Sequence, residues 1–147
     1  MIHKKKHNDA PVGLVLVLFF AAAIIYLFAS SDSAKGQIPS YVTGDVRAVY
    51  EWARTQEGND LLEQMPCYCG CKYEGHKHAR HCFWRDDGSF DRHGTTCSTC
   101  LDIAKKTMQM SKQGKSVCEI RNEIDRFYAP NVNLGTNTPM PRGCAAS

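Results

Sequence analysis

The side chains with the clearest chemical potential lie between residues 67 and 100, where six of the eight cysteines occur together with four of the six histidines. Thiolate sulfur and imidazole nitrogen are the ligands that Zn(II) and Cu(I) prefer, whereas Ca²⁺ and Mg²⁺ are held by clusters of oxygen atoms. This segment therefore predicts a site for a soft transition metal. Copper is favoured over zinc because closely spaced thiolates select Cu(I). The predicted ligands are Cys67, Cys69, Cys71, Cys82, Cys97, Cys100, His81 and His93.

The spacing of the cysteines supports a shared site. Cys67, Cys69 and Cys71 alternate along the chain, so their sulfurs project to one side of an extended segment, or wrap around an ion if the segment coils. Neighbouring cysteines of a C-x-C pair are poor disulfide partners for each other, because their side chains point apart. Cys97 and Cys100 form a C-x-x-C at the start of a predicted helix, whose N-terminus lowers a thiol pKa. We expect this pair to close the site.

The two histidines are chosen by their neighbours in the sequence. His81 adjoins Cys82, and His93 precedes Cys97, so both are expected near sulfur. The other histidines of the segment are typical of a solvated loop.

A second interpretation of the cysteines needs no metal. Eight is an even number, and four disulfides could staple a small domain in an oxidising compartment, with 105 possible pairings. A mixed arrangement is more plausible than either extreme. In it, Cys118 and Cys144 pair with each other or with cluster members, and the remaining six cysteines bind metal or form bridges. The alternative function is therefore a disulfide-stapled accessory subunit of a larger membrane protein complex.

Other function classes find little support. Leu101 follows the C-x-x-C where covalent c-type haem attachment requires histidine, so that cofactor is excluded. A thioredoxin-like motif lies within a βαβ pattern, and no strand pattern precedes this one, so exported thiol–disulfide exchange ranks last. No triad order identifies a nucleophile. The net charge of +3 comes without a basic stripe that would bind nucleic acid. We expect a binding protein that is not an enzyme and has no nucleic-acid partner.

An uncharged apolar run, PVGLVLVLFFAAAIIYLFAS, occupies residues 11–30. A helix of this length reaches about 30 Å, which matches the hydrocarbon core of a bilayer. Lys4, Lys5 and Lys6 precede the run, so the positive-inside rule places the N-terminus in the cytoplasm and the cysteine-rich part outside the cell membrane. A cleaved signal peptide is the alternative, but the run exceeds the ~7–15 apolar residues of a signal peptide. We therefore predict a single-pass anchor.

Helical patterns dominate the rest of the chain. Apolar residues recur at three- and four-residue spacing from Val42 to Ala53, with Gly58 as the expected stop, and a short turn follows over 59–65. A similar pattern runs from Leu101 to Met108 and closes near Gly114. Beyond it, Ser116 and Glu119 form a capping box in front of a further amphipathic helix.

The predicted fold class is mainly α, with a transmembrane helix and a small helical extracytoplasmic domain that carries an irregular Cys/His-rich loop. Cys67–Gly94 is the expected loop, because it lacks both helical and strand periodicity. The predicted parts are a cytoplasmic basic segment (1–10), the transmembrane helix (11–30), a linker (31–40), the Cys/His domain (41–130) and an irregular tail (131–147).

The order of these residues resembles the PCYCGC-motif family of bacterial and archaeal membrane-anchored or lipid-anchored proteins. The resemblance rests on the run PCYCGC at 66–71 and on later landmarks in the same order, namely Gly75-His76, Cys82-Phe83, Phe90-Asp91, His93, Cys97, Cys100, Glu119-Ile120, Ile124-Asp125 and Tyr128. It implies an exported protein for which metal binding is a natural expectation. Cys118 and Cys144 are additions to the family-like cysteines, and no lipid-acceptor cysteine follows the apolar run.

Overall fold

A computed structural model describes residues 12–145; for residues 12, 27–35 and 129 it describes the backbone alone. The chain divides into two compact units, Met1–Gly36 and Gln37–Ser147, which are treated separately here. The predicted basic segment 1–10 lies outside the described residues. Within those residues there is no strand, only an isolated antiparallel bridge between Trp84 and Phe90, so the mainly α prediction is confirmed.

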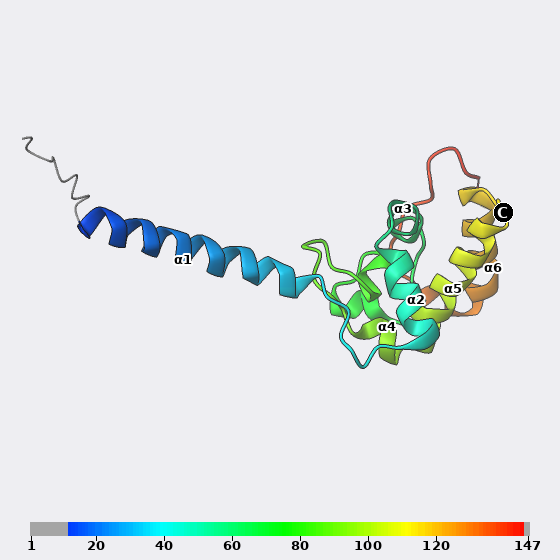
Figure 1. Cartoon of the computed structure of the whole chain (residues 1–147). Helices are drawn as coiled ribbons and strands as arrows, with labels where there is room; N and C mark the ends of the chain where they lie inside the picture. The colour runs from blue at the N-terminus through cyan, green and yellow to red at the C-terminus, as the bar shows by residue number, and fades with distance from the viewer. Residues whose placement is uncertain (1–11, 146–147) are drawn as a thin grey trace, which may run out of the picture. The chain divides into compact units, whose positions relative to one another are not determined.

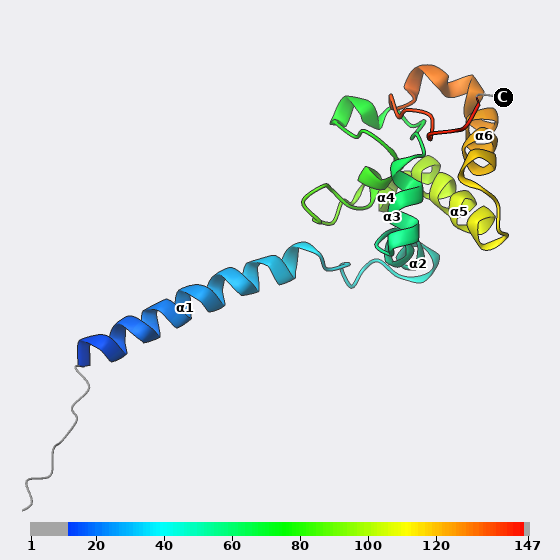
Figure 2. The ribbon, with the colours of Figure 1, turned by 90° about the horizontal axis from the view of Figure 1, so that it is seen from above.

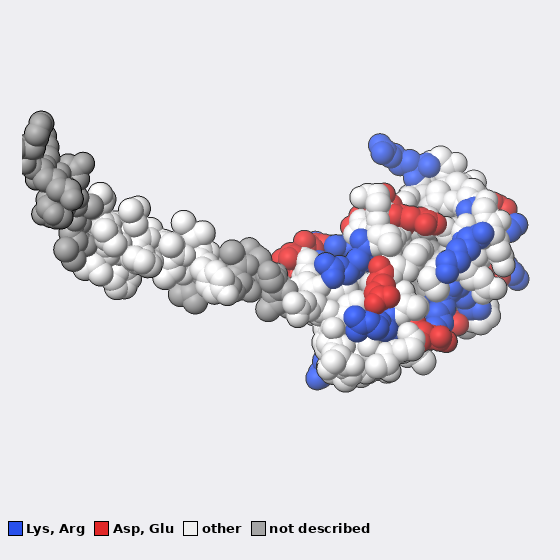
Figure 3. Space-filling model, viewed as in Figure 1, with Lys and Arg blue, Asp and Glu red and all other residues white. Residues whose placement is uncertain are grey.

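The first unit contains one helix, α1 (Val12–Lys35) (Figure 1). Its described side chains carry no charge (Figure 3). Large apolar residues from Leu14 to Tyr26 are exposed on consecutive positions and therefore on every face. The helix continues through the first half of the predicted linker and ends at Lys35, just before Gly36.

Membrane crossing is not shown by the helices of the structure. In the part of the chain that is described, none of them combines the length and the apolar character that a membrane span requires. The structure thus confirms a helix over most of 11–30, but it does not show the predicted transmembrane role.

The second unit begins with two short helices, α2 (Gly44–Ala53) and α3 (Gln56–Glu63). Thr43 lies at the N-cap position of α2, although its side chain makes no capping hydrogen bond. Gly58 does not stop the first helix as predicted. Instead α2 ends at Ala53, and Thr55 caps α3 by accepting a hydrogen bond from the Gly58 N–H at 3.1 Å.

Gly58 is required by a close approach between these helices. A Cβ atom added there would lie 2.1 Å from the carbonyl oxygen of Trp52, which is backbone and cannot move aside. We expect Gly58→Ala to lower the free energy of unfolding by about 1–3 kcal/mol, despite the better helix propensity of alanine. Chemical denaturation measures this change. Asn59→Ala, on the same helix but in contact only with exposed side chains, is the matched control and should change stability by less than about 0.5 kcal/mol. Equal effects would contradict this packing.

The following segment is largely irregular, as predicted, with 3₁₀ turns η1 (Cys71–Glu74) and η2 (Ala79–Cys82). Tyr50 of α2 holds this loop in place. Its hydroxyl donates to the Asp91 carbonyl oxygen at 2.7 Å, its carbonyl accepts the indole N–H of Trp84 at 2.9 Å, and its ring stacks on Phe90. The loop therefore wraps around one buried aromatic ring.

A helical hairpin completes the core. A short helix, α4 (His93–Thr96), leads into α5 (Ser98–Lys112), and α6 (Val117–Tyr128) returns beside α5 (Figures 1 and 2). The predicted turn is present at Gly114, which has a φ of 76°. The capping box is also confirmed, because the Ser116 N–H donates to Glu119 at 2.8 Å and the Glu119 N–H donates to Ser116 Oγ at 3.3 Å. The backbone and side-chain hydrogen bonds from Ser116 lower the pKa of Glu119 to about 2.

The buried face of α5 is rotated slightly from the predicted one. Ala104 is fully buried as expected, but Leu101 and Met108 are only partly buried against the core. The fully buried positions are Cys100, Ile103, Ala104 and Thr107. The rotation brings Cys100, in the first turn of α5, into the centre of the domain.

The C-terminal tail is not a free appendage. A 3₁₀ segment, η3 (Ala129–Leu134), follows α6, and the chain then returns to pack beside the first cysteines of the loop. A disulfide between Cys118 of α6 and Cys144 fixes the end of the tail. The sequence left this pairing open, and the structure settles it.

Candidate metal centre

The first cysteines are held by backbone pairing with the tail. The Cys67 N–H donates to Thr136 Oγ1 at 2.9 Å, and the Thr136 N–H donates to the Cys67 carbonyl at 2.9 Å. The Gly70 N–H donates to the Leu134 carbonyl at 3.2 Å. Gly70 has a φ of 85°, in the region that favours glycine, and its turn directs Cys71 into the core. The C-x-C-x-C segment is thus clamped at both ends.

Four buried sulfurs form an inner group, made up of Cys67, Cys71, Cys82 and Cys100. The Cys82 sulfur lies 3.7 Å from that of Cys67 and 3.8 Å from that of Cys71, and the Cys67 and Cys100 sulfurs are 3.0 Å apart. A tetrahedral zinc ion with Zn–S bonds of about 2.3 Å separates its sulfurs by about 3.8 Å. The two separations from Cys82 match a four-thiolate site, whereas the Cys67–Cys100 separation is shorter.

An outer group adjoins the inner one and is made up of Cys69, His93, Cys97 and Cys100. The Cys69 sulfur lies 3.3 Å from the Cys100 sulfur and 3.4 Å from His93 Nε2. Cys69, His93 and Cys97 are partly exposed, whereas Cys100 is buried. Cys100 belongs to both groups and Cys97 to the outer one, so the structure brings the predicted C-x-x-C together with the earlier cysteines.

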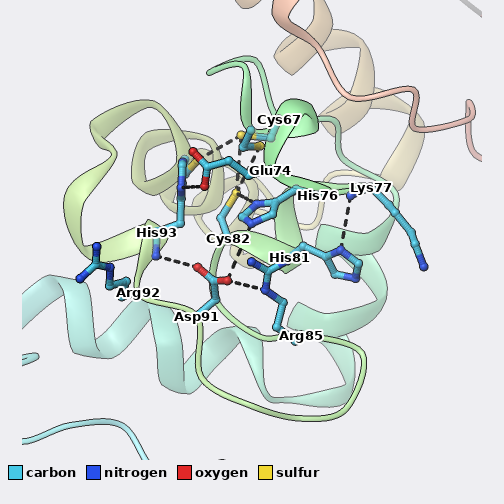
Figure 4. Close-up of polar contacts among 12 residues, drawn as sticks. Cys67, Glu74, His76, Lys77, His81, Cys82, Arg85, Asp91, Arg92 and His93 are labelled. Atoms are coloured by element: carbon cyan, nitrogen blue, oxygen red, sulfur yellow. Dashed lines mark hydrogen bonds and ion pairs between the residues drawn. The ribbon is translucent and has the colours of Figure 1, made fainter.

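His93 has the environment expected of a metal-binding histidine. While Nε2 faces sulfur, Nδ1 lies 3.3 Å from a carboxylate oxygen of Glu74 (Figure 4). Histidines that bind metals commonly donate their other ring N–H to a carboxylate, which fixes the tautomer and the ring orientation. The position of His93 is set by its backbone N–H, which donates to the Asp91 carboxylate at 2.8 Å.

His76 lies beside the sulfurs although it was not among the predicted ligands. Its ring is buried, Nδ1 is 3.4 Å from the Cys82 sulfur, and Nε2 is 3.7 Å from an oxygen of Asp91. Its placement follows from Gly75, whose φ of 84° ends η1 and turns the chain back toward Cys71. The Gly-His pair is the only sequence signal that could have pointed to it.

His81 lies elsewhere, although it adjoins Cys82 in the sequence. Its Nε2 is 2.6 Å from Asp86, and in Figure 4 its ring lies beside Lys77, away from the sulfurs. His78 packs against it and completes a separate group. Both Lys77 and Arg80 pair with Asp86, so this carboxylate is already surrounded by positive charge, and we interpret the group as structural.

Protons within the cluster are unevenly shared. The hydrogen bond from Cys100 lowers the pKa of Cys69 to about 5, and it also lowers the pKa of Cys71 and of Cys82. Hydrogen bonding to Cys67 and the other thiols raises the pKa of Cys100. Hydrogen bonds with Cys71 and Cys82 raise the pKa of His76 to about 10. The cluster thus combines thiols whose pKa is lowered with thiols whose pKa is raised.

All six clustered cysteines are free thiols, and the only disulfide among the described residues is the one between Cys118 and Cys144. The mixed arrangement therefore describes this chain better than four crosslinks. Beside the outer group a surface cavity opens, with Glu74 and His93 in its wall. No cysteine lines this cavity, but Cys69 and Cys97 of the outer group are themselves partly exposed, whereas the inner cysteines are buried.

Comparison with known proteins identifies one similarity. A family model described as a protein of unknown function with PCYCGC motif matches residues 28–141. Searches of curated proteins and of solved structures each found no match.

Proposed function

Because the chain belongs to the PCYCGC-motif family, for which the motif and not an activity is the defining feature, we propose from its cysteine cluster that it binds a soft transition metal. The observation that carries the proposal is the convergence of five other free thiols and the imidazole of His93 around the Cys100 sulfur. Free thiols packed in a protein interior without a disulfide are a suitable ligand set for a thiophilic cation.

We favour copper as Cu(I), with zinc next. Six thiols and one imidazole form a strongly sulfur-rich donor set, and soft thiolates select Cu(I). Zinc is supported by the sulfur separations of the inner group, which suit a tetrahedral ion. Equilibration of the chain with both ions under anaerobic conditions, followed by elemental analysis, tests this order. Retention of zinc in place of copper would reverse this order of preference.

Matched pairs of serine substitutions test metal binding itself. Cys67→Ser/Cys69→Ser removes one ligand from each group, and we expect the full chain to lose at least about nine-tenths of its bound metal, since ligand number sets affinity. Cys118→Ser/Cys144→Ser also removes two sulfurs, but from the disulfide, and should keep the metal. Elemental analysis after anaerobic purification gives the readout. A metal-free native protein, or equal metal in both variants, would reject the proposal.

The alternative function, a disulfide-stapled accessory subunit, predicts the opposite thiol content, namely no free thiols in the denatured protein. Our proposal expects six reactive thiols after metal removal without a reductant. Thiol–disulfide exchange through Cys97 and Cys100 is the least favoured reading. Burial raises the pKa of Cys97, and hydrogen bonding to Cys67 raises that of Cys100, whereas reactive cysteines have lowered values.

We also propose that α1 anchors the domain to the cell membrane, with the N-terminus in the cytoplasm and the cluster outside. Support comes from apolar side chains exposed on every face of α1, which need an apolar environment. Extraction of membranes at alkaline pH should leave the chain in the pellet, and a protease added to intact cells should remove the cysteine-rich unit. Release into the soluble fraction would overturn the anchor without affecting metal binding.

A further inference from the structure

We infer that the cluster holds two metal ions, one in the inner group and one in the outer group, bridged by the sulfur of Cys100. This inference rests on the proposed function and extends it to the number of ions and to their different roles. Cys100 is the only residue shared by the two four-ligand groups. Its sulfur is 3.0 Å from that of Cys67 in the inner group and 3.3 Å from that of Cys69 in the outer group.

A single ion does not account for the side chains present. A tetrahedral ion takes four ligands, so one ion in the inner group leaves Cys69, Cys97 and His93 without a metal. These three ligand atoms and the Cys100 sulfur all lie within 4.8 Å of one another, close enough to share one further ion. The Glu74 carboxylate beside His93 orients the His93 ring. An ion held by the four inner sulfurs does not use His93 as a ligand, so this orientation serves a second ion.

Bridging by Cys100 is consistent with where the sequence places it. Its sulfur lies in the first turn of α5, where the helix N-terminus stabilises negative charge. A thiolate sulfur has enough lone pairs to bind two cations once they displace its proton, and complete burial holds the Cys100 side chain between the two groups. The chain thus needs only seven ligands for two four-coordinate ions.

The two ions are expected to exchange at different rates. The inner group has only sulfur ligands, all of them buried. In the outer group Cys69, Cys97 and His93 are partly exposed, and the adjoining cavity reaches His93. The inner ion therefore has a structural role, while the outer ion is the one that can be delivered to, or accepted from, another soft-metal carrier.

Cadmium-113 NMR of the full chain in detergent micelles tests the inference, because Cd²⁺ is a thiophilic probe with a nuclear spin. We expect two resonances of equal intensity, with the all-sulfur ion downfield, and a mutual splitting transmitted through the shared sulfur. Cys97→Ser should halve the cadmium content and leave the downfield resonance unsplit. His93→Gln, a substitution at the partly exposed rim, should weaken the binding of the same outer ion. It serves as a second test if Cys97→Ser does not fold. Cys118→Ser/Cys144→Ser should leave both resonances unchanged.

The outcomes separate this inference from the function beneath it. One cadmium ion per native chain overturns the two-ion site but leaves metal binding intact, whereas no bound cadmium overturns both. Two resonances without mutual splitting overturn the bridge. Loss of both ions from His93→Gln, in a chain that remains folded, overturns the division into inner and outer groups.

Discussion

Removal of the bound metal is expected to lower the free energy of unfolding of the 37–145 unit by at least about 4 kcal/mol, relative to protein with free metal at about a thousand times its Kd. A ligand that binds only the folded state stabilises it by mass action, and these ligands are assembled only by folding. Cys67 and Cys71 follow α3, Cys82 ends η2, and Cys100 lies in the first turn of α5, so the inner ion would crosslink segments far apart in the chain.

The measurement is denaturant unfolding of the full chain, followed by far-UV circular dichroism, with saturating metal and with a chelator. Reductant is omitted so that the disulfide between Cys118 and Cys144 stays intact in both samples. Cys67→Ser/Cys69→Ser is the control, because its stability should not respond to the chelator. Identical unfolding curves for the native chain under the two conditions would show that its folding does not depend on a bound ion.

Features set by nearby residues could be predicted from the sequence. The capping box joins Ser116 and Glu119 within a single turn, and Gly114 closes the preceding helix, so both follow from short-range patterns. The association of the C-x-C-x-C sulfurs with the later C-x-x-C was also correctly anticipated, because no other soft donors of comparable density occur in the chain.

The choice between the histidines could not be made in this way. His81 adjoins Cys82, yet successive residues of the 3₁₀ turn η2 point in different directions, and the ring of His81 turns toward Asp86. His76 lies farther from any cysteine in the sequence, but the turn at Gly75 brings it within 3.4 Å of the Cys82 sulfur. Proximity in sequence was a poor guide because tight turns separate neighbouring side chains.

The role of the tail was missed for a different reason. Residues 131–147 have no periodicity, and they were predicted to be irregular, which is correct for most of the described part beyond η3. Their contacts, however, pair Thr136 with Cys67, at a separation of 69 residues. No local pattern encodes such a contact, since it depends on the packing of α6, which brings the tail back to the motif.

Replacing Arg121 with methionine is expected to lower the free energy of unfolding by about 3–5 kcal/mol, the range seen when one partner of a buried charged network is removed. Arg121 is a buried residue of α6, and its guanidinium donates to the carbonyls of Gln64 at 2.9 Å, Pro139 at 2.8 Å and Thr138 at 3.1 Å. Its Nε also donates to Asp125. Methionine fills a similar volume but satisfies none of these acceptors.

Arg126→Met on the same helix is the matched control, since Arg126 is exposed and pairs only with Glu123, and it should cost less than about 1 kcal/mol. Gln64 precedes the PCYCGC segment, and Thr138 follows Thr136 in the tail. Arg121 therefore connects α6 by hydrogen bonds to both of the segments that pair at Cys67. Arg121→Met should therefore also weaken metal binding, and saturating metal should restore part of the lost stability. An Arg121→Met chain as stable as the Arg126→Met chain would mean that the clamp on Cys67 does not depend on Arg121.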